Sequence, residues 1–225
     1  MRLEKYLVNC GLGSRRVIIE EVKNGNITVN GEIVYDERID IEKEDVILYR
    51  EKFLKEKELK YYALYKTSGY ITAMKDDNRP TVVELLPSWF PKESFFPIGR
   101  LDRDTEGLLI FTNDGDLNQK MTQPKSKVEK TYLVELFFSI KDEDIKKLEL
   151  GVEINGHKCL PAKVEKVNEQ AILLTIVEGK FHQVKRMMRS INNKVKYLKR
   201  MTFGKMELGN LKEGELMEIL LEDLI

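Results

Sequence analysis

Apolar side chains recur at helical spacing near the start of the chain. Leu3 and Leu7 stand four positions apart, which predicts a short helix over residues 2–8 with one apolar face. Ser14 is a residue type that accepts hydrogen bonds from the first turn of a helix, and it precedes a second amphipathic stretch over residues 15–23. We therefore expect two short helices here.

Short strand-like segments follow these helices. Residues 27–29 and 32–34 are separated by Asn30-Gly31, the dipeptide most typical of a tight β-hairpin. Residues 45–49 have the pattern of a further strand. Two helices packed on a small sheet are the expected result.

A charged segment then separates two parts of the chain. Residues 51–60 are mostly charged, and the aromatic, strand-like stretch 61–65 opens the next part. Because charged segments with few apolar positions are typical of linkers, we expect a small module with its linker over residues 1–57. A larger domain is then expected over residues 58–225.

The larger part alternates strand patterns with turn residues. Lys130 to Leu136 places Tyr132, Val134 and Leu136 on one face, as in a half-buried strand. The other elements that the pattern predicts are strands over 61–66, 107–112 and 171–177, a strand continuation over 70–74, a helix over 82–86 capped by Thr81, and a helix from about 184 to 191.

A dense polar cluster stands directly before the buried strand 107–112, which an Asn-Asp-Gly turn follows. Its members are Arg100, Asp102, Arg103, Asp104, Thr105 and Glu106. A loop anchored by a buried strand can hold a carboxylate steadily, so the cluster is a candidate site with Asp102 as its principal residue. The alternative is a solvated loop of mutual ion pairs, because surface charge clusters are common and stabilise little.

Composition limits the class of protein. A chain of 225 residues with 42% hydrophobic content can form one sizeable domain and a small one. No apolar run approaches the roughly 18 to 20 residues that cross a bilayer, and the first residues lack the apolar stretch of a secretory signal. A globular protein in the cytoplasm is expected.

Cysteine and histidine are too sparse for a metal centre. Cys10 and Cys159 form no Cys-x-x-Cys pair, and His157 and His182 have no second ligand at a recognisable spacing. No glycine-rich phosphate loop is present either. We expect no disulfide, no metal and no cofactor.

The net charge of zero conceals a strong asymmetry along the chain. Residues 179–205 contain nine basic residues and no acidic one, whereas the tail from Met206 onward contains six acidic residues and a single lysine. A second basic group comprises Lys120, Lys125, Lys127 and Lys130. Such clusters fit a polyanion, whose binding releases counterions and weakens with salt. The alternative is an ordinary solvated lysine face.

The polar cluster lies in a recognisable pattern. Residues 99–102 (Gly-Arg-Leu-Asp), 105–109 (Thr-Glu-Gly-Leu-Leu) and 112–115 (Thr-Asn-Asp-Gly) resemble the signature of the pseudouridine synthases, in particular their small-subunit ribosomal branch. The resemblance implies that Asp102 is the catalytic residue. It also suggests that Arg100 fills the space left when the target base leaves its stack.

Three further segments resemble motifs of the same family. Lys66-Thr67-Ser68-Gly69 with Pro80-Thr81-Val82 resembles its first motif. Glu129 to Tyr132 resembles the tyrosine motif, which implies that Tyr132 stacks on the target base. Residues 178–187 resemble the third motif, which implies that Lys185 pairs with Asp102.

The resemblance also implies residues that contact the substrate. Leu198 matches a leucine that packs against the base opposite the tyrosine. His182, Gln183 and Arg186 lie in the third motif and are candidate RNA contacts. An aromatic side chain on the apolar face of a strand, such as Tyr132, is more often part of the core than of a site, and for Leu198 a purely structural position in the core is equally compatible with the pattern.

The amino-terminal part resembles the S4 RNA-binding module. The resemblance is carried by residues 2–7, 13–16 and 27–31. It implies binding of structured RNA through the two helices, with phosphate contacts from Arg2, Lys5, Arg15, Arg16 and Lys23. The alternative is a plain amphipathic helix pair.

Taken together, these resemblances imply an α+β protein. A small S4-like α/β module precedes a pseudouridine synthase domain built on a large mixed, mostly antiparallel sheet with flanking helices. The implied activity is isomerisation of a specific uridine in 16S rRNA, free or in an assembling small ribosomal subunit, by a monomer without a cofactor. The alternatives are a large-subunit (23S) synthase of the same family and a non-catalytic RNA-binding assembly factor.

Overall fold

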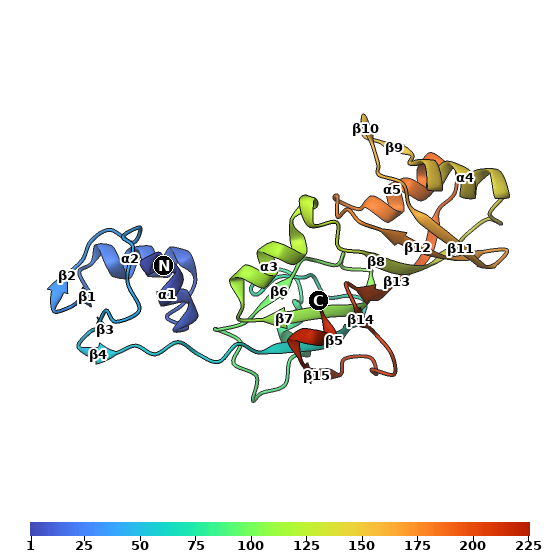
Figure 1. The fold of residues 1–225 in the computed structure, drawn as a ribbon. Coiled ribbons are helices and arrows are strands. Elements are labelled where there is room, and N and C mark those ends of the chain that lie inside the picture. Colours follow the sequence, from blue (N-terminus) through green and yellow to red (C-terminus); the bar gives the residue numbers. More distant parts are fainter. The chain divides into compact units, whose positions relative to one another are not determined.

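The computed structural model describes residues 1–225, which form two compact units (Figure 1). The first unit comprises Met1–Leu59 and Pro91–Phe95, and the second comprises Lys60–Phe90 and Phe96–Ile225. None of the helices has both the length and the apolar character that crossing a membrane requires.

The first unit contains the two predicted helices and a four-stranded sheet. Its elements are α1 (Leu3–Asn9), α2 (Arg15–Lys23), β1 (Ile27–Val29), β2 (Glu32–Ile33), β3 (Ile47–Tyr49) and β4 (Lys52–Phe53), with strand order β2-β1-β3-β4. Ser14 caps α2 by accepting a hydrogen bond from the backbone N–H of Val17 at 3.4 Å. The predicted helices and hairpin are confirmed.

The apolar faces of these elements form the core of the first unit. Its buried members are Leu3, Leu7, Ile18, Val22, Ile27, Ile41 and Ile47. The four-residue spacing of Leu3 and Leu7 therefore does mark the inner face of α1, and both side chains are fully buried.

Part of the predicted linker is folded. Lys52 and Phe53 form β4, which pairs with Tyr49 and Leu48 of β3. The turn between the strands is made by Arg50 and Glu51, with φ values of 46° and 66°. Two successive positive φ angles are those of a type I′ hairpin turn, which Arg-Glu seldom adopts, so the sequence did not predict it.

The second unit is built on one nine-stranded sheet (Figure 1). Its main order is β11-β12-β8-β13-β7-β5-β15, with β14 paired to β13 and β6 paired to β7. The strands are β5 (Tyr61–Lys66), β6 (Phe96–Ile98), β7 (Glu106–Thr112), β8 (Lys130–Leu136), β11 (Lys163–Asn168), β12 (Ala171–Ile176), β13 (Val195–Phe203), β14 (Met206–Glu207) and β15 (Leu216–Ile219).

All neighbouring strands of this sheet are antiparallel except β7 and β13, which are parallel. The predicted mixed, mostly antiparallel sheet is confirmed. The alternation in β8 is also confirmed, because Tyr132, Val134 and Leu136 are buried and the residues between them are half-exposed.

Short helices flank the sheet, and a two-stranded ribbon lies apart from it. The helices are α3 (Gly115–Thr122), α4 (Asp142–Leu150), α5 (Gln183–Ser190) and the 3₁₀ turns η1 (Val82–Leu85), η2 (Pro124–Ser126) and η3 (Leu221–Asp223), and the ribbon pairs β9 (Glu153–Ile154) with β10 (His157–Lys158). Figure 1 shows α4 and α5 at the β11–β12 end of the sheet and α3 beside β6.

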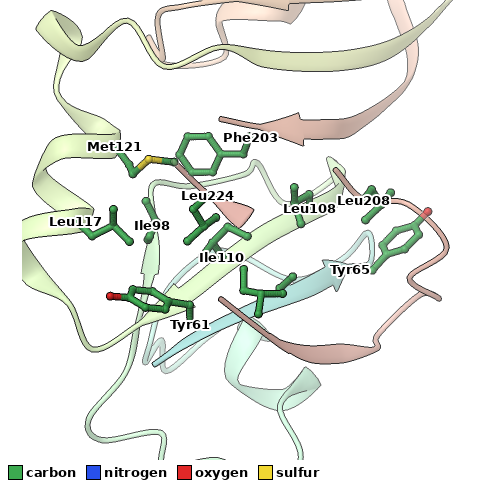
Figure 2. Packing of buried hydrophobic residues seen from close by; sticks show 12 residues of the cluster. Tyr61, Tyr65, Ile98, Leu108, Ile110, Leu117, Met121, Phe203, Leu208 and Leu224 are labelled. Atoms are coloured by element: carbon green, nitrogen blue, oxygen red, sulfur yellow. The ribbon is translucent and has the colours of Figure 1, made fainter. Parts of the chain in front are cut away.

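A large hydrophobic cluster packs against the central strands (Figure 2). Tyr61 and Tyr65 of β5 and Leu108 and Ile110 of β7 lie on one face of the sheet, where Leu117 and Met121 of α3 cover them together with Phe203 and Leu224. Alternate residues of a strand point to the same face, which explains why the members of each pair are separated by an even number of positions.

The expectation for residues 70–74 is wrong. They form no strand, and only Ile71 makes an isolated bridge, to Thr81. Gly69, with φ of 98°, turns the chain out of the sheet, and the Thr72 hydroxyl bonds instead to the backbone of Leu101. The helix predicted over 82–86 is a single 3₁₀ turn, in which the Glu84 carboxylate accepts from the Thr81 N–H.

Candidate active site

The loop from Gly99 to Thr105 joins β6 to β7 and is held at several points. Thr72 Oγ1 donates to the Leu101 carbonyl at 2.8 Å and accepts from the Leu101 N–H at 3.0 Å. The Thr105 N–H donates to the Asp102 carbonyl at 3.1 Å. Asp102 thus sits in a loop whose backbone is fixed on both sides, as a well-positioned carboxylate requires.

Lys66 fixes the same loop from inside the protein. It ends β5, is fully buried, and its Nζ donates to the carbonyls of Thr67, Arg103 and Thr105 at 3.0, 3.3 and 2.7 Å. Burial lowers the pKa of Lys66 to about 8. Since its three donors all have acceptors, this lysine stabilises the folded loop rather than facing a ligand.

Lys66→Met is expected to lower the free energy of unfolding of the second unit by about 2–4 kcal/mol, because the buried Thr105 carbonyl and two part-buried carbonyls lose their donor. Thermal unfolding followed by circular dichroism measures the change. Lys75→Met is the matched control, since the Lys75 side chain is 87% exposed and its ion pair with Asp77 spans 3.8 Å; its effect should stay below about 0.5 kcal/mol. Equal stability of Lys66→Met and wild type would contradict this role of Lys66.

The parallel pairing of β7 and β13 requires a glycine at position 107. Gly107 has φ of 98°, and a Cβ placed on it would lie 2.2 Å from the carbonyl oxygen of Arg200. Only a residue without a Cβ allows the two backbones to approach so closely. This close approach brings the end of the Asp102 loop against β13.

Asp102 lies in a small group of charged side chains. Lys185, in the first turn of α5, donates through Nζ to Asp102 Oδ2 at 2.9 Å and to Asp104 Oδ1 at 2.5 Å. His182 Nε2 lies 3.5 Å from Asp102 Oδ1. The Lys185 and Asp102 side chains are 19% and 27% exposed, whereas that of Asp104 is 71% exposed.

The pKa shifts agree with this arrangement. Burial acts to lower the pKa of Lys185, but its hydrogen bonds to Asp104 and Asp102 outweigh burial and raise it above the ordinary value. Burial acts to raise the pKa of Asp104, but the hydrogen bond and charge of Lys185 outweigh it and lower the pKa. Lys185 is therefore a firmly protonated cation between two carboxylates.

The loop before α5 is ordered by the side chain of Gln183. Gln183 is 4% exposed, accepts from the Lys180 N–H at 2.9 Å, and donates to Glu178 Oε2 at 3.1 Å. Because its side-chain amide bonds to two residues of this loop, Gln183 stabilises the loop. His182 stands at the end of this loop with φ of 51°, and its ring stacks on Phe181 with centroids 3.8 Å apart.

Tyr132 and Leu198 complete the wall of a cavity at Asp102. They come from the adjacent strands β8 and β13 and are 8% and 4% exposed. The cavity measures about 80 Å³ and is lined by Arg100, Leu101, Asp102, Thr105, Tyr132, Ile176, Gly179, Lys180, His182, Gln183, Val184, Lys185 and Leu198. The structure thus brings together most of the site residues that the resemblance implied in this unit. Arg186 lies one position further along α5, with its guanidinium 5.0 Å from the Phe181 ring centroid.

The candidate RNA contacts of the S4-like part lie on the helices of the first unit. Arg15, Arg16 and Lys23 are exposed on α2, and Lys5 is half-buried on α1. Arg2 precedes α1, donates to the carbonyl of Arg38 and lies 3.7 Å from a carboxylate oxygen of Asp40. Arg15, Arg16 and Lys23 therefore present a basic face on a single helix.

Sequence reasoning gave no individual role in the site to three cations and a hydroxyl that shape it. They are Lys66 and Thr72, which hold the Asp102 loop, and Lys130 and Arg200, which line a second cavity beside it. For Lys66 the sequence did carry a signal, because this lysine directly follows the apolar, strand-like stretch 61–65. No group of three or more His, Cys, Asp or Glu side chains is placed to hold a metal ion.

Comparison with known families defines the class of protein. The family model described as RNA pseudouridylate synthase matches residues 60–190, and the S4 domain model matches residues 1–47. The chain therefore belongs to the RNA pseudouridine synthases, isomerases that act on RNA, and carries an S4 domain ahead of the catalytic fold.

Individual relatives cover nearly the whole chain. An uncharacterized RNA pseudouridine synthase of Bacillus subtilis, YtzG, is 42% identical over 232 residues, covering 100% of this chain and 97% of that protein. Ribosomal small subunit pseudouridine synthase A of Vibrio parahaemolyticus is 36% identical, with 95% and 93% coverage. Ribosomal large subunit pseudouridine synthase B of Bacillus subtilis is 35% identical, with 97% and 91% coverage.

A solved structure agrees with these relatives. The crystal structure of a pseudouridylate synthase matches this fold with a TM-score of 0.73 and 31% sequence identity, covering 99% of this chain and 97% of that one.

Proposed function

We propose that Asp102 is the catalytic carboxylate for converting a uridine of 16S rRNA to pseudouridine. The single observation that supports this most is the Asp102–Lys185 contact of 2.9 Å at a cavity walled by Tyr132 and Leu198. One carboxylate is held by a fixed loop and a protonated lysine, next to two side chains suited to enclose a base. Asp102 is the one carboxylate among the residues that line this cavity.

The reaction needs few chemical groups. The N1–C1′ bond of the uridine breaks, the uracil turns while it is held, C5 bonds to C1′, C5 loses its proton and N1 gains one. A positioned carboxylate serves either as a nucleophile at C1′ or C6 or as a base at the sugar. Enclosure by Tyr132 and Leu198 keeps the free uracil from escaping between the two steps.

The roles of the other residues follow from their positions. Lys185 stabilises the negative charge of Asp102 while its bond to Asp104 holds the ammonium group in place. We assign contacts with the RNA around an extruded uridine to Arg100 and His182, which are exposed and line the cavity, and to the half-buried Arg186. Gln183 serves indirectly, by fixing the loop that carries His182 and Lys185.

We assign the S4 domain to backbone contacts with structured RNA. Arg15, Arg16 and Lys23 are exposed on α2, where side chains of this kind bind phosphates without reading sequence. A monomer acting in the cytoplasm on rRNA or on an assembling small subunit fits this arrangement.

The 16S substrate is supported by the form of the third motif. Residues 182–185 (His-Gln-Val-Lys) resemble the small-subunit branch more than the large-subunit branch, whose third motif usually carries Asn-Arg, and a relative named for the small subunit is 36% identical. A relative named for the large subunit is 35% identical, so 23S rRNA is the alternative substrate. Both substrates would use the same carboxylate.

Tritium release from RNA labelled at uridine C5 tests the substrate. The protein is incubated separately with 16S transcripts, 23S transcripts and partly assembled small subunits. Release only from 16S RNA or small subunits is the expected result. Release only from 23S RNA would replace the 16S assignment with the large-subunit one, and binding without release from any RNA would favour an assembly factor.

A further inference from the structure

A second cavity of about 320 Å³ opens beside Asp102 in the second unit. Its walls share Arg100, Asp102, Tyr132, Gly179, Lys180 and His182 with the smaller cavity. The remaining wall residues include Lys130 of β8 and Arg200 of β13, which the reaction described above does not use. These two cations set the second cavity apart.

Arg200 is buried without a counter-ion. It is 2% exposed, its Nε donates to the Leu108 carbonyl at 2.7 Å, and its Nη2 has no hydrogen-bond partner. The guanidinium lies 4.7 Å from the centroid of the Phe203 ring, and its side-chain partner is Tyr132 rather than a carboxylate. A buried, unpaired guanidinium nitrogen is costly, so its retention at a cavity wall points to a partner from outside the chain.

Lys130 lies against the same ring. Its Nζ is 5.4 Å from the Phe203 centroid and donates to the Val128 carbonyl at 2.7 Å. Burial, followed by the nearby charge of Arg200, lowers the pKa of Lys130 to about 8. Lys130 therefore faces a second cation and no acid, and the two charges repel each other.

The acidic residues of the cavity wall already have partners. Glu178 lies 3.2 Å from the Lys180 Nζ and accepts from Gln183, and Asp102 is paired with Lys185. The unbalanced charge inside this cavity is thus that of Lys130 and Arg200, to which the exposed Arg100 adds at the surface. An anion that entered would satisfy both cations and gain from the low dielectric of their surroundings.

We propose that this cavity holds a phosphodiester group of the RNA substrate, bound by Lys130 and Arg200. The RNA is favoured over a free anion because the two cavities share the walls around Asp102 and Tyr132. This inference rests on the proposed function, in which a uridine that reaches Asp102 carries its own phosphates into the adjoining space. Lysine and arginine are the usual partners of phosphate, lysine as a point charge and arginine as a fork of donors.

Two binding measurements test this proposal. In the first, backbone amide shifts of ¹⁵N-labelled protein are followed during titration with inorganic phosphate, with sodium chloride at equal ionic strength as reference. In the second, affinity for a 16S transcript is measured over a range of salt concentrations. The variants are Lys130→Met and Lys130→Arg, with Lys146→Met as control, because Lys146 is exposed on α4 and does not line the cavity.

Phosphate is expected to shift the amides of Gly179 and Lys180 in the wild type, Lys130→Arg and Lys146→Met, with at least roughly tenfold weaker binding in Lys130→Met. The slope of log affinity against log salt should fall in magnitude by about 0.7 to 0.9 in Lys130→Met alone. Lys130→Met is the test variant because Arg200 also donates a hydrogen bond to Leu108 of β7, so that its replacement would disturb the sheet.

Three outcomes would overturn the proposal. Equal phosphate affinity in Lys130→Met and wild type would exclude Lys130 as a ligand, and equal shifts with chloride would show an unspecific ionic effect. Loss of phosphate binding with an unchanged salt slope would assign the cavity to a free anion instead of the RNA.

Discussion

Asp102→Asn is expected to reduce tritium release from the RNA substrate on the order of 10³-fold or more, because the amide can neither attack carbon nor accept a proton from the sugar. Asparagine keeps the size of the side chain and one acceptor for Lys185. Affinity for the RNA, measured by filter binding, should therefore change little. Single-turnover measurement separates the chemical step from binding.

Asp104→Asn is the matched control for this substitution. Asp104 shares the Lys185 ammonium with Asp102 but is 71% exposed, so its carboxylate lies toward solvent. We expect turnover within a few-fold of the wild type. If Asp104→Asn were as inactive as Asp102→Asn, or if Asp102→Asn kept wild-type turnover, the proposed role of Asp102 would be refuted.

Lys185→Met is expected to reduce turnover on the order of 10²-fold. Asp102 and Asp104 would lose the cation that both contact, at 2.9 and 2.5 Å, and the negative charge at Asp102 would lack its stabilising partner. The defect should appear in the chemical step more than in RNA affinity, and single-turnover tritium release measures it.

Lys185→Arg tests whether the position requires only a positive charge or also the shape of the lysine side chain. An arginine keeps the positive charge and can bond to both carboxylates, so it should recover most of the lost turnover. Recovery no better than with methionine would argue that the position requires the shape of lysine. Wild-type turnover in Lys185→Met would show that Asp102 needs no cation.

The same ion group has a consequence for stability against pH. The pKa of Asp104 is lowered in the folded protein, so its pairing contributes stability above the pKa of the unfolded chain and loses it as the pH falls through the lower folded value. The pKa of Lys185 is raised, so its share is present at neutral pH and disappears only in strong alkali. The melting temperature of wild type should therefore exceed that of Lys185→Met by a constant amount near neutral pH, and this difference should decrease as Asp104 is protonated in acid.

Much of the fold was predictable because it depends on neighbours in the chain. The Ser14 cap, the Asn30-Gly31 hairpin and the alternation around Tyr132 each reflect interactions within a few residues, and the structure contains all three. Residues 70–74 were wrongly predicted as a strand because their partner is distant: Thr72 bonds to Leu101 in the loop of Asp102.

The site divides in the same way. The motifs around Asp102, Tyr132 and Lys185 were recognisable one by one, each as a short string of residues. Their meeting at one cavity depends on the order of strands in the sheet, which places β8 between β12 and β13 and β13 beside β7. The distance of 2.9 Å between Lys185 and Asp102, 83 positions apart, is a product of that order.

The sequence by itself determined the local elements, the motifs and the family, since these depend on short-range hydrogen bonding, side-chain periodicity and residue identity. The tertiary structure alone decided which polar groups are buried together. Lys66 reaches three loop carbonyls, and Lys130 and Arg200 meet around Phe203, because strands distant in the chain become neighbours in the sheet. Because they are buried together, these cations support the Asp102 loop and form a candidate phosphate site. No pattern of adjacent residues predicts this burial.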